Sequence, residues 1–335
     1  MTTVRGYAAF KAGGPLEPYE YQLGPIGPDE VDLSVDSCGI CYSDVSMIDN
    51  AWGFTPYPLV PGHEIVGTVR ATGERVSHLA VGDIVGLGWN AGSCLFCAEC
   101  MSGDHHMCAS AVSTFIGRPG GYAEQVRAQA HAVFKLPSGV DPRTAGPLMC
   151  GGITVFSPFS QFGISPTASV GVVGIGGLGH LAVKFARAWG CHVTAFTSTE
   201  AKRAEALAMG AHEVMLSRDT AAIARAAGRF DLLLTTVNVP LDWNALLGTL
   251  KRRGRLHVLG AVTEPLAFPV TSLMMAHRSV SSSPSGSPSD ISKMLDFVGR
   301  HGIAPQTEHF KLDRVNEAIE HLRSGKARYR VVLDR

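Results

Sequence analysis

A glycine-rich turn that follows an apolar strand constrains the fold of this chain more than any other feature. The turn is Gly174-Ile175-Gly176-Gly177-Leu178-Gly179, and it joins a strand predicted over residues 170–173 to a helix predicted over residues 178–189. The glycines permit a tight turn and a close approach of the backbone to a ligand. In this strand–turn–helix context, G-x-G-x-x-G predicts a dinucleotide pyrophosphate on the helix N-terminus rather than a purely structural turn.

Strand and helix patterns alternate through the region around this turn. Further strands are predicted over residues 192–196, 213–216, 231–235 and 255–259, and a further helix over residues 200–209. Alternation at this pitch implies right-handed crossovers and a parallel sheet. We therefore expect a doubly wound Rossmann domain of the α/β class here.

The end of the second strand in such a domain distinguishes between cofactors. An NAD-binding domain usually carries Asp or Glu at this point, which accepts a hydrogen bond from the adenine ribose 2′-hydroxyl. This chain instead has three hydroxyl side chains and then two cations: Thr197, Ser198, Thr199, Lys202 and Arg203. Without a carboxylate to repel a 2′-phosphate, the pattern favours NADP(H). Either cation alone is also compatible with a solvated helix surface.

The first 150 residues have a different character. Short apolar runs, such as residues 31–35 and 65–69, alternate with turns rich in Gly and Pro, which is typical of a mostly β domain. In the tail, the serine-rich residues 281–289 predict a loop. Helices are predicted over 291–298 and 315–322, and a strand over 329–333. This pattern does not assign the tail to either domain.

The overall composition excludes several classes of protein. Hydrophobic residues make up 45% and charged residues 17%, and 29 Lys+Arg balance 29 Asp+Glu. This balance favours neither nucleic acid nor a membrane surface as a partner. The N-terminus has no apolar signal region, so we expect a cytoplasmic protein with reduced thiols.

Four of the eight cysteines lie in one short segment: Cys94, Cys97, Cys100 and Cys108. This spacing suits closed coordination of a structural zinc by four thiolates better than a disulfide framework. His105 and His106 lie in the same segment, but four thiolates already complete a tetrahedron. We expect both histidines to be surface residues.

Three further candidate positions for metal ligands are scattered along the chain. They are Cys41, the pair His63-Glu64, and Cys150. Spacing cannot identify ligands that lie so far apart. From the residues alone, the two cysteines are equally well explained as small buried hydrophobic side chains, and His63 as a loop histidine.

The order of these motifs resembles that of the zinc-containing alcohol dehydrogenases of the medium-chain dehydrogenase/reductase superfamily. The resemblance rests on residues 39–44, 61–64 and 150–155, the four-cysteine segment and the glycine turn. Residues 197–199 with Lys202, and residues 328–332, are most similar to the cinnamyl-alcohol-dehydrogenase branch. The resemblance implies a GroES-like β-rich catalytic domain over residues 1–152, to which residues 281–335 return. It also implies a Rossmann NADP(H)-binding domain over residues 153–280.

The resemblance also implies roles for individual residues. Cys41, His63 and Cys150 match the ligands of a catalytic zinc, and Glu64 matches a carboxylate that approaches the metal transiently. Asp44 matches a residue that orients the ligand histidine, and Ser43 a hydroxyl that passes a proton toward the nicotinamide ribose. The remaining matches are a nicotinamide contact, Thr154, and two side chains of the substrate pocket, Trp52 and Trp89. Either tryptophan is equally compatible with a core position.

The chain departs from the family pattern at two positions. The family commonly has histidine at the positions of Tyr42 and Ser46, and at the second of these the imidazole passes a proton to solvent. A serine hydroxyl cannot act as a base near neutral pH. We therefore expect reduction to be the favoured direction and alcohol oxidation to be weak at neutral pH.

Together these features predict a zinc enzyme that transfers a hydride between NADP(H) and an aldehyde or primary alcohol, acting as an aldehyde reductase. Two alternatives remain: reduction of an imine or an activated C=C bond on the same scaffold, and a non-catalytic nucleotide-binding protein. The resemblance also implies a homodimer, formed through edge strands of the nucleotide domains. Two zinc ions per chain and a small-molecule substrate are expected, and neither nucleic acid nor a membrane is an expected partner.

Overall fold

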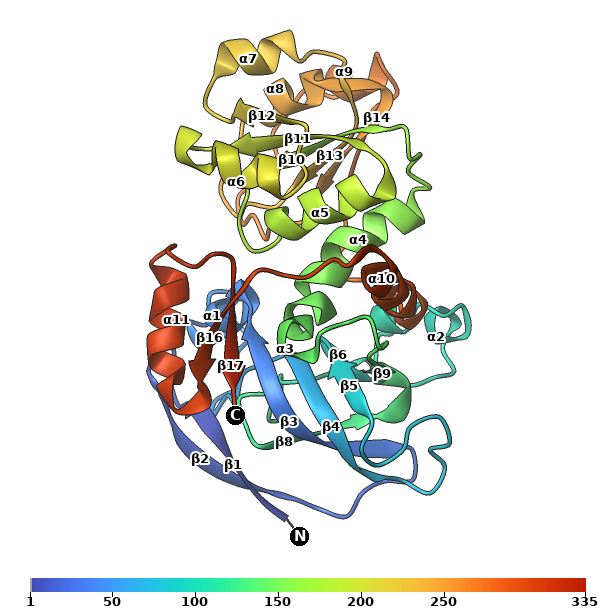
Figure 1. Ribbon diagram of the computed structural model, residues 1–335, viewed down its shortest axis with the longest axis vertical. Helices are drawn as coiled ribbons and strands as arrows, with labels where there is room; N and C mark the ends of the chain where they lie inside the picture. Colours follow the sequence, from blue (N-terminus) through green and yellow to red (C-terminus); the bar gives the residue numbers. More distant parts are fainter. Residues whose placement is uncertain (1) are drawn as a thin grey trace. The chain divides into compact units, whose positions relative to one another are not determined.

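The computed structural model describes residues 2–335, which form two compact units (Figure 1). The first unit joins Met1–Ile153 to Gly286–Arg335, and the second unit is Thr154–Ser285. The tail therefore belongs to the first unit. The second boundary lies at Gly286 rather than at residue 281, because β15 (Ser279–Ser282) pairs with the sheet of the second unit.

The first unit is built on a sheet with the strand order β16-β17-β3-β4-β5-β9, and β8 also pairs with β3. A β1–β2 hairpin and a β6–β7 pair complete its strands. The strands are β1 (Thr2–Ala9), β2 (Leu16–Leu23), β3 (Glu30–Ile40), β4 (Glu64–Thr72), β5 (Ile84–Leu87), β6 (Asn90–Gly92), β7 (Val112–Ser113), β8 (Gln125–Gln129), β9 (Val133–Lys135), β16 (Thr307–Lys311) and β17 (Arg330–Asp334).

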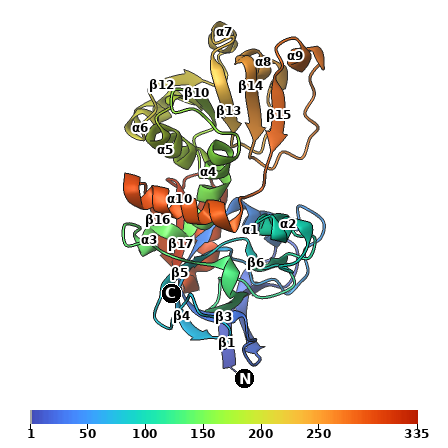
Figure 2. The same cartoon turned by 90° about the vertical axis from the view of Figure 1, so that its right-hand side faces the viewer.

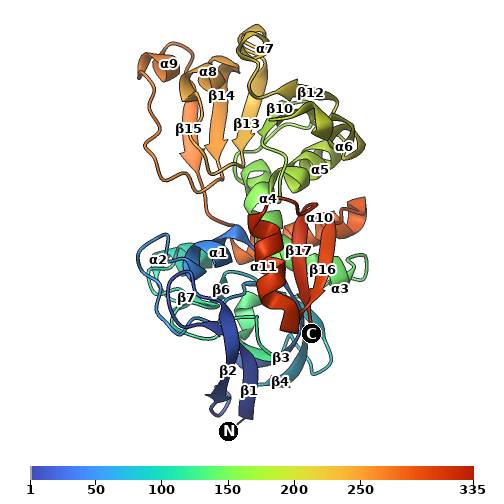
Figure 3. The same ribbon diagram turned by 90° about the vertical axis from the view of Figure 1, so that its left-hand side faces the viewer.

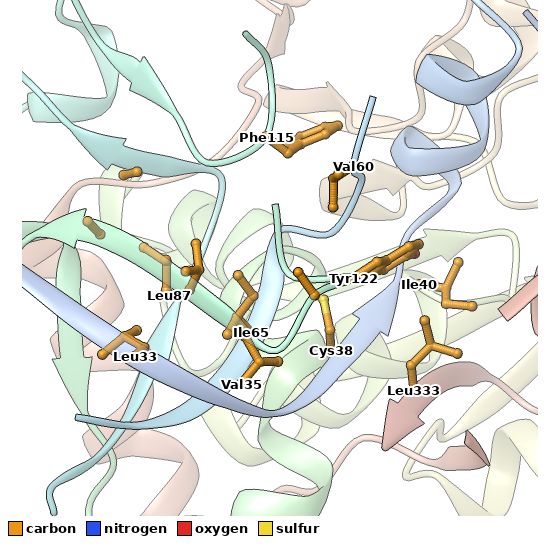
Figure 4. Packing of buried hydrophobic residues seen from close by; sticks show 14 of the residues in the cluster. Leu33, Val35, Cys38, Ile40, Val60, Ile65, Leu87, Phe115, Tyr122 and Leu333 are labelled. Atoms are coloured by element: carbon orange, nitrogen blue, oxygen red, sulfur yellow. The ribbon is translucent and has the colours of Figure 1, made fainter. Parts of the chain in front are cut away.

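Side chains that alternate along these strands form the core of the first unit. Val31, Leu33 and Val35 of β3 are buried, as the two-residue period of a strand requires. Cys38 is 1% exposed and lies in this cluster with Ile65 (Figure 4). It is a buried core thiol, as is Cys191 in the second unit, which is also 1% exposed.

Short helices connect the strands of the first unit, and α11 lies beside β17 and β16 (Figure 3). The α-helices are α1 (Tyr42–Ile48), α2 (Ala98–Met101), α3 (Pro142–Ala145), α10 (Pro288–His301) and α11 (Val315–Arg323); α4 (Gly151–Gln161) leads into the second unit. The 3-10 helices of the first unit are η1 (His105–Met107), η2 (Ala130–Ala132), η3 (Gly146–Met149) and η5 (Leu312–Arg314).

The second unit is a parallel sheet with the strand order β12-β11-β10-β13-β14-β15. Its strands are β10 (Ser169–Val173), β11 (His192–Thr197), β12 (Glu213–Leu216), β13 (Phe230–Thr235), β14 (Leu250–Val258) and β15 (Ser279–Ser282). The order runs outward in both directions from the neighbours β10 and β13. A doubly wound sheet has its switch point there, and ligands bind beyond the carboxyl ends of its strands at that point.

Helices follow most of these strands, as the sequence pattern predicted. They are α5 (Gly179–Trp189), α6 (Arg203–Ala208), α7 (Thr220–Arg225), α8 (Trp243–Gly248) and α9 (Thr271–Met274), with the 3-10 helix η4 (Glu200–Lys202) before α6. The helix predicted over residues 200–209 is thus two short elements. The loop predicted over residues 281–289 is also shorter than expected: Ser282 ends β15, and Ser287 caps α10 by accepting a hydrogen bond from the Asp290 N–H.

Across residues 2–335, every helix is too short or too polar to cross a membrane.

Candidate metal and cofactor sites

Two thiols, an imidazole and a carboxylate meet inside the first unit. One ligand atom from each of Cys41, His63, Glu64 and Cys150 lies within 4.8 Å of the others. The Sγ atoms of Cys41 and Cys150, which are 109 residues apart in sequence, are 3.9 Å apart. Cys41 precedes α1, His63 and Glu64 enter β4, and Cys150 lies between η3 and α4. The fold thus gathers the scattered candidates at one point.

Asp44 contacts both of the chain segments that carry Cys41 and His63. Its Oδ2 accepts a hydrogen bond from the Cys41 N–H at 2.9 Å, and its Oδ1 accepts one from the Gly62 N–H at 3.0 Å. The same Oδ1 is 3.0 Å from His63 Nδ1. A carboxylate only accepts, so it retains the proton on Nδ1 and leaves Nε2 as the basic nitrogen.

The donor set fits a zinc ion. His63 Nε2 and Glu64 Oε2 are buried and have no hydrogen-bond partner among the described residues. A buried polar atom without a partner is costly, and metal coordination removes that cost. Two cysteines and one histidine are a ligand set of catalytic zinc, in which a further position stays open for substrate.

One oxygen of the Glu64 carboxylate is bound by a buried arginine. Its Oε1 accepts a hydrogen bond from Arg330 Nη2, and both side chains are almost fully buried. Burial raises the pKa of Glu64 to about 7, although the Arg330 guanidinium opposes this shift. Gly39 makes room for the second oxygen, because a Cβ at that position would lie 2.1 Å from Glu64 Oε2.

The charge around Cys41 favours a thiolate. A hydrogen bond from Cys150 lowers the pKa of Cys41 well below its usual value, and the His63 imidazole lowers it further against the effect of burial. The thiolate is the form of cysteine that binds metal.

Two aromatic side chains pack against the imidazole and against each other. The Trp89 ring meets His63 edge-on with centroids 4.8 Å apart, Phe115 stacks on His63 at 5.0 Å, and the Trp89 and Phe115 rings are 5.1 Å apart. Trp52 packs against Trp89 at 6.4 Å, and Phe54 stacks on Trp52 at 6.0 Å. The two predicted pocket residues therefore lie in one aromatic row that starts at the metal cluster.

The hydroxyl of Ser43 lies at the same point. Its Oγ is 3.6 Å from the Sγ of Cys41, and the side chain is half-buried. Ser46 follows three residues later in α1, on the same face of that helix, and is also half-buried. Tyr42 is 52% exposed.

The four-cysteine segment forms a second cluster. One Sγ each from Cys94, Cys97, Cys100 and Cys108 lies within 4.8 Å of the others, and every one of these cysteines is a free thiol. Backbone N–H groups of Phe96 and Cys97 lower the pKa of Cys94 to about 6. His105 is outside this group and only partly exposed, with its Nδ1 3.3 Å from Ser93 Oγ. His106 is also half-buried, so both histidines are partly exposed at the surface and neither belongs to the four-thiol group.

In the second unit, the glycine turn has the geometry of a nucleotide-binding loop. Gly174 has φ +91°, and a Cβ on Gly179 would lie 1.8 Å from the Gly174 carbonyl oxygen. A Cβ on Gly176 would meet no atom within 4 Å, so the backbone there is open to a ligand. Gly177 and Leu178 complete the turn, and α5 begins directly after it. The N–H groups of its first turn supply an anion site.

The side chains after β11 divide into two groups. Lys202 Nζ donates to the Ile175 carbonyl at 3.0 Å, which places the ammonium beside the glycine turn. Ser198 and Thr199 are exposed. Thr197 is buried, and its hydroxyl donates to the Thr199 carbonyl at 2.7 Å. Its side chain therefore shapes the turn instead of facing a ligand.

Two of the predicted cofactor contacts have protein partners in the structure. The Arg203 guanidinium pairs with Glu200 and donates to the Val214 carbonyl at 3.1 Å. The Thr154 hydroxyl donates to the Pro284 carbonyl at 3.1 Å. Because Arg203 is paired with Glu200, Lys202 is the cation that contacts the glycine turn.

Two family models match the chain. Residues 27–138 match the alcohol dehydrogenase GroES-like domain, and residues 177–300 match the zinc-binding dehydrogenase domain. An aldehyde reductase from Synechocystis sp. is 55% identical over 330 residues, which cover 98% of this chain and 98% of that protein. The chain belongs to the zinc-containing alcohol dehydrogenase family. It is an alcohol dehydrogenase or aldehyde reductase of the cinnamyl-alcohol-dehydrogenase-like branch.

Solved structures of this branch share the fold. A cinnamyl alcohol dehydrogenase from Sorghum bicolor superposes with a TM-score of 0.95 at 37% identity, covering 99% of this chain and 98% of that one. One from Helicobacter pylori, in complex with NADP(H), has a TM-score of 0.92 at 28% identity and the same coverage. The α/β fold, with a GroES-like domain and a parallel-sheet Rossmann domain, is confirmed.

Sequence reasoning missed several residues in and around the candidate metal site. Phe115 was not singled out, because a lone phenylalanine in a β domain is indistinguishable from a core residue. Phe54 gave no signal for the same reason. Arg330 gave no signal for a pairing with Glu64, since the two lie 266 residues apart.

Proposed function

We propose that this chain is an NADPH-dependent aldehyde reductase that binds a catalytic zinc through Cys41, His63 and Cys150 and a structural zinc through Cys94, Cys97, Cys100 and Cys108. The observation that carries this proposal is the buried His63 Nε2, which lies in a cluster with two thiols and has no hydrogen-bond partner within residues 2–335. The similarity to an aldehyde reductase favours a carbonyl substrate over an imine or C=C bond. It also favours an enzyme over a non-catalytic protein.

The reaction converts an aldehyde, NADPH and a proton into a primary alcohol and NADP⁺. Zinc, when bound, polarises the carbonyl oxygen of the substrate as a Lewis acid. The Ser43 hydroxyl holds the proton that the substrate oxygen receives, and its position near Cys41 supports this role. The apolar faces of Trp52 and Trp89 hold the aldehyde and exclude water.

Two carboxylates support the metal ligands in different ways. Asp44 fixes the tautomer and the direction of the His63 ring. Glu64 is a transient ligand, because Arg330 holds one of its oxygens while the other has no partner among the described residues. Neither carboxylate touches the substrate in this proposal.

The cofactor contacts in the second unit are the glycine turn, Thr154, and the side chains after β11. Lys202 beside Ile175, with the exposed hydroxyls of Ser198 and Thr199, supports a site for the 2′-phosphate of NADP(H). Thr197 and Arg203 support this site indirectly, because they fix the backbone around it through hydrogen bonds to the Thr199 and Val214 carbonyls. We assign Thr154 to the nicotinamide end of the cofactor.

Initial rates with NADPH and NADH on cinnamaldehyde, benzaldehyde and aliphatic aldehydes test this function. We expect rapid turnover that strongly prefers NADPH. The Ser198→Asp variant should reverse this preference by roughly a hundredfold, because a carboxylate repels the 2′-phosphate and accepts from a 2′-hydroxyl. Ser165→Asp is the matched control and should leave the preference unchanged, because Ser165 is exposed and lies before β10, at the opposite end of the parallel strands from this site. Binding of NADPH without reduction of any aldehyde would reject the carbonyl assignment.

The serine at position 46 leads us to expect that aldehyde reduction is favoured over alcohol oxidation near neutral pH. We expect the Ser46→His variant to oxidise primary alcohols at least about tenfold faster than the native chain near pH 7, because imidazole accepts a proton at this pH and a hydroxyl does not. Ser46→Ala should behave like the native chain, and aldehyde reduction by both variants should change little. An unchanged oxidation rate for Ser46→His would remove the argument that this position sets the direction.

We further propose a cytoplasmic homodimer joined through the edge strand β15. Open sheet edges favour strand pairing, and β15 is the last strand of its sheet. Val270, Met274 and Met275 precede it and are 63%, 61% and 75% exposed. Exposed apolar clusters of this kind mark protein interfaces.

A further inference from the structure

The segment after β15 lies where the second half of the cofactor is expected. We call residues 281–285 the serine segment. In a doubly wound sheet the two halves of a dinucleotide lie on opposite sides of the switch point. The glycine turn follows β10, so the nicotinamide half belongs to the carboxyl ends of β13, β14 and β15, which lie side by side (Figure 2). The serine segment begins at the carboxyl end of β15.

A buried histidine of β14 holds this segment. The His257 side chain is 0% exposed. Its Nδ1 is 2.8 Å from Ser281 Oγ, and its Nε2 is 3.1 Å from Ser283 Oγ. Burial, assisted by Arg255, lowers the pKa of His257 to about 4, so the ring is neutral at neutral pH. One ring nitrogen therefore donates and the other accepts.

The neighbouring arginine contacts the first of these serines. Arg255 Nη1 donates to Ser281 Oγ at 3.3 Å. Each serine hydroxyl can donate or accept, so both contacts of His257 are satisfied in either neutral tautomer. The side chains of Arg255 and His257 together fix the position of both serines.

Helix α4 holds the same segment through two further hydrogen bonds. Thr154 Oγ1 donates to the Pro284 carbonyl at 3.1 Å, and Ser157 Oγ donates to the Ser285 carbonyl at 3.1 Å. Phe162, just after α4, packs under the Arg255 guanidinium at 3.9 Å and meets the His257 ring at 5.2 Å. The histidine and the predicted nicotinamide contact Thr154 are therefore connected through the serine segment.

We propose that His257 is a positioning residue for the nicotinamide half of NADP(H). It fixes the serine segment and, through the Pro284 carbonyl, the direction of the Thr154 hydroxyl. His257 itself touches neither cofactor nor substrate. The inference rests on the proposed function only for the identity of the cofactor.

Measuring the binding of two ligands distinguishes a role of His257 in positioning the nicotinamide from a general role in stability. NADPH carries the nicotinamide, and 2′-phospho-ADP-ribose lacks it but retains the other contacts. We expect His257→Ala to weaken NADPH binding about tenfold, as the loss of one or two hydrogen bonds would. The same variant should leave the dissociation constant of 2′-phospho-ADP-ribose unchanged. Both constants are measured by fluorescence titration.

Conservative variants identify the hydrogen bond that matters. His257→Gln can place an amide N–H at the position of Nε2 and should bind NADPH nearly as the native chain does. His257→Asn reaches only the position of Nδ1, loses Ser283 and should resemble His257→Ala. Adding Ser283→Ala to His257→Ala should have no further effect, because the two side chains act through one contact.

Thr249→Ala is the control for lost stability. Thr249 is buried in the same unit and donates to the Leu246 carbonyl at 2.7 Å. It should lower the melting temperature without affecting either ligand. The proposal is overturned if His257→Ala only lowers the melting temperature, or if it weakens both ligands equally. A native chain that binds NADPH but reduces no aldehyde would instead reject the proposed function, since these titrations need no turnover.

Discussion

The Cys150→Ala variant is expected to lose aldehyde reduction by roughly a thousandfold or more while it still folds and binds NADPH. Cys150 is one of the two thiols beside His63, and Lewis-acid activation of a carbonyl is worth several kcal/mol. The glycine turn lies in the second unit and Cys150 in the first, so we expect NADPH still to bind. Zinc content and NADPH titration, measured with the rate, separate loss of metal from loss of fold.

Cys38→Ala is the matched control for this variant. Cys38 is a buried thiol of the same unit, but it belongs to the hydrophobic cluster and not to the ligand group. It should keep about two zinc ions per chain and its activity, whereas Cys150→Ala should keep about one. Retention of both zinc ions and of the native rate in Cys150→Ala would show that the ligands are elsewhere.

The second large effect is on stability. We expect Cys100→Ala to lower the melting temperature by about 10 °C or more, because a four-thiolate zinc site supplies folding free energy to the segment that it closes. Cys100 is 4% exposed, and its Sγ is 3.9 Å from Cys94 Sγ. Calorimetry measures the melting temperature. Metal analysis should show the loss of one zinc ion per chain, and limited proteolysis should cleave the four-cysteine segment faster than in the native chain.

Met101→Ala in the same segment is the control, since Met101 is 76% exposed. This variant should keep its zinc, its melting temperature and its resistance to proteolysis. If Cys100→Ala loses a zinc and yet melts like the native chain, the four-cysteine cluster does not stabilise the fold.

Local patterns predicted the parts of the molecule that are local in sequence. The glycine turn and the four-cysteine cluster each lie in one short segment, and each strand of the parallel sheet is marked by its own apolar run. Boundaries were less accurate where side-chain contacts decide them. Helix α10 begins at Pro288, inside the predicted loop, because Ser287 and Asp290 form a capping box there.

The cluster of Cys41, His63, Glu64 and Cys150 could not be predicted from spacing. Cys41 and Cys150 meet only because β3, β4 and η3 pack together, and their separation in sequence carries no signal. The family resemblance supplied that information. It did not reveal that the Thr197 hydroxyl turns back to the Thr199 carbonyl or that Arg203 pairs with Glu200. Such local pairings depend on side-chain rotamers, which sequence patterns do not encode.

The three contacts of Asp44 connect two separate segments of the chain. A single carboxylate accepts hydrogen bonds from the backbone of Cys41 and of Gly62 and contacts the imidazole of His63. A displacement of either segment therefore disturbs a contact that holds the other. The mutual arrangement of Cys41 and His63 is thus fixed by hydrogen bonds of the protein itself, at a carboxylate that is not a proposed ligand.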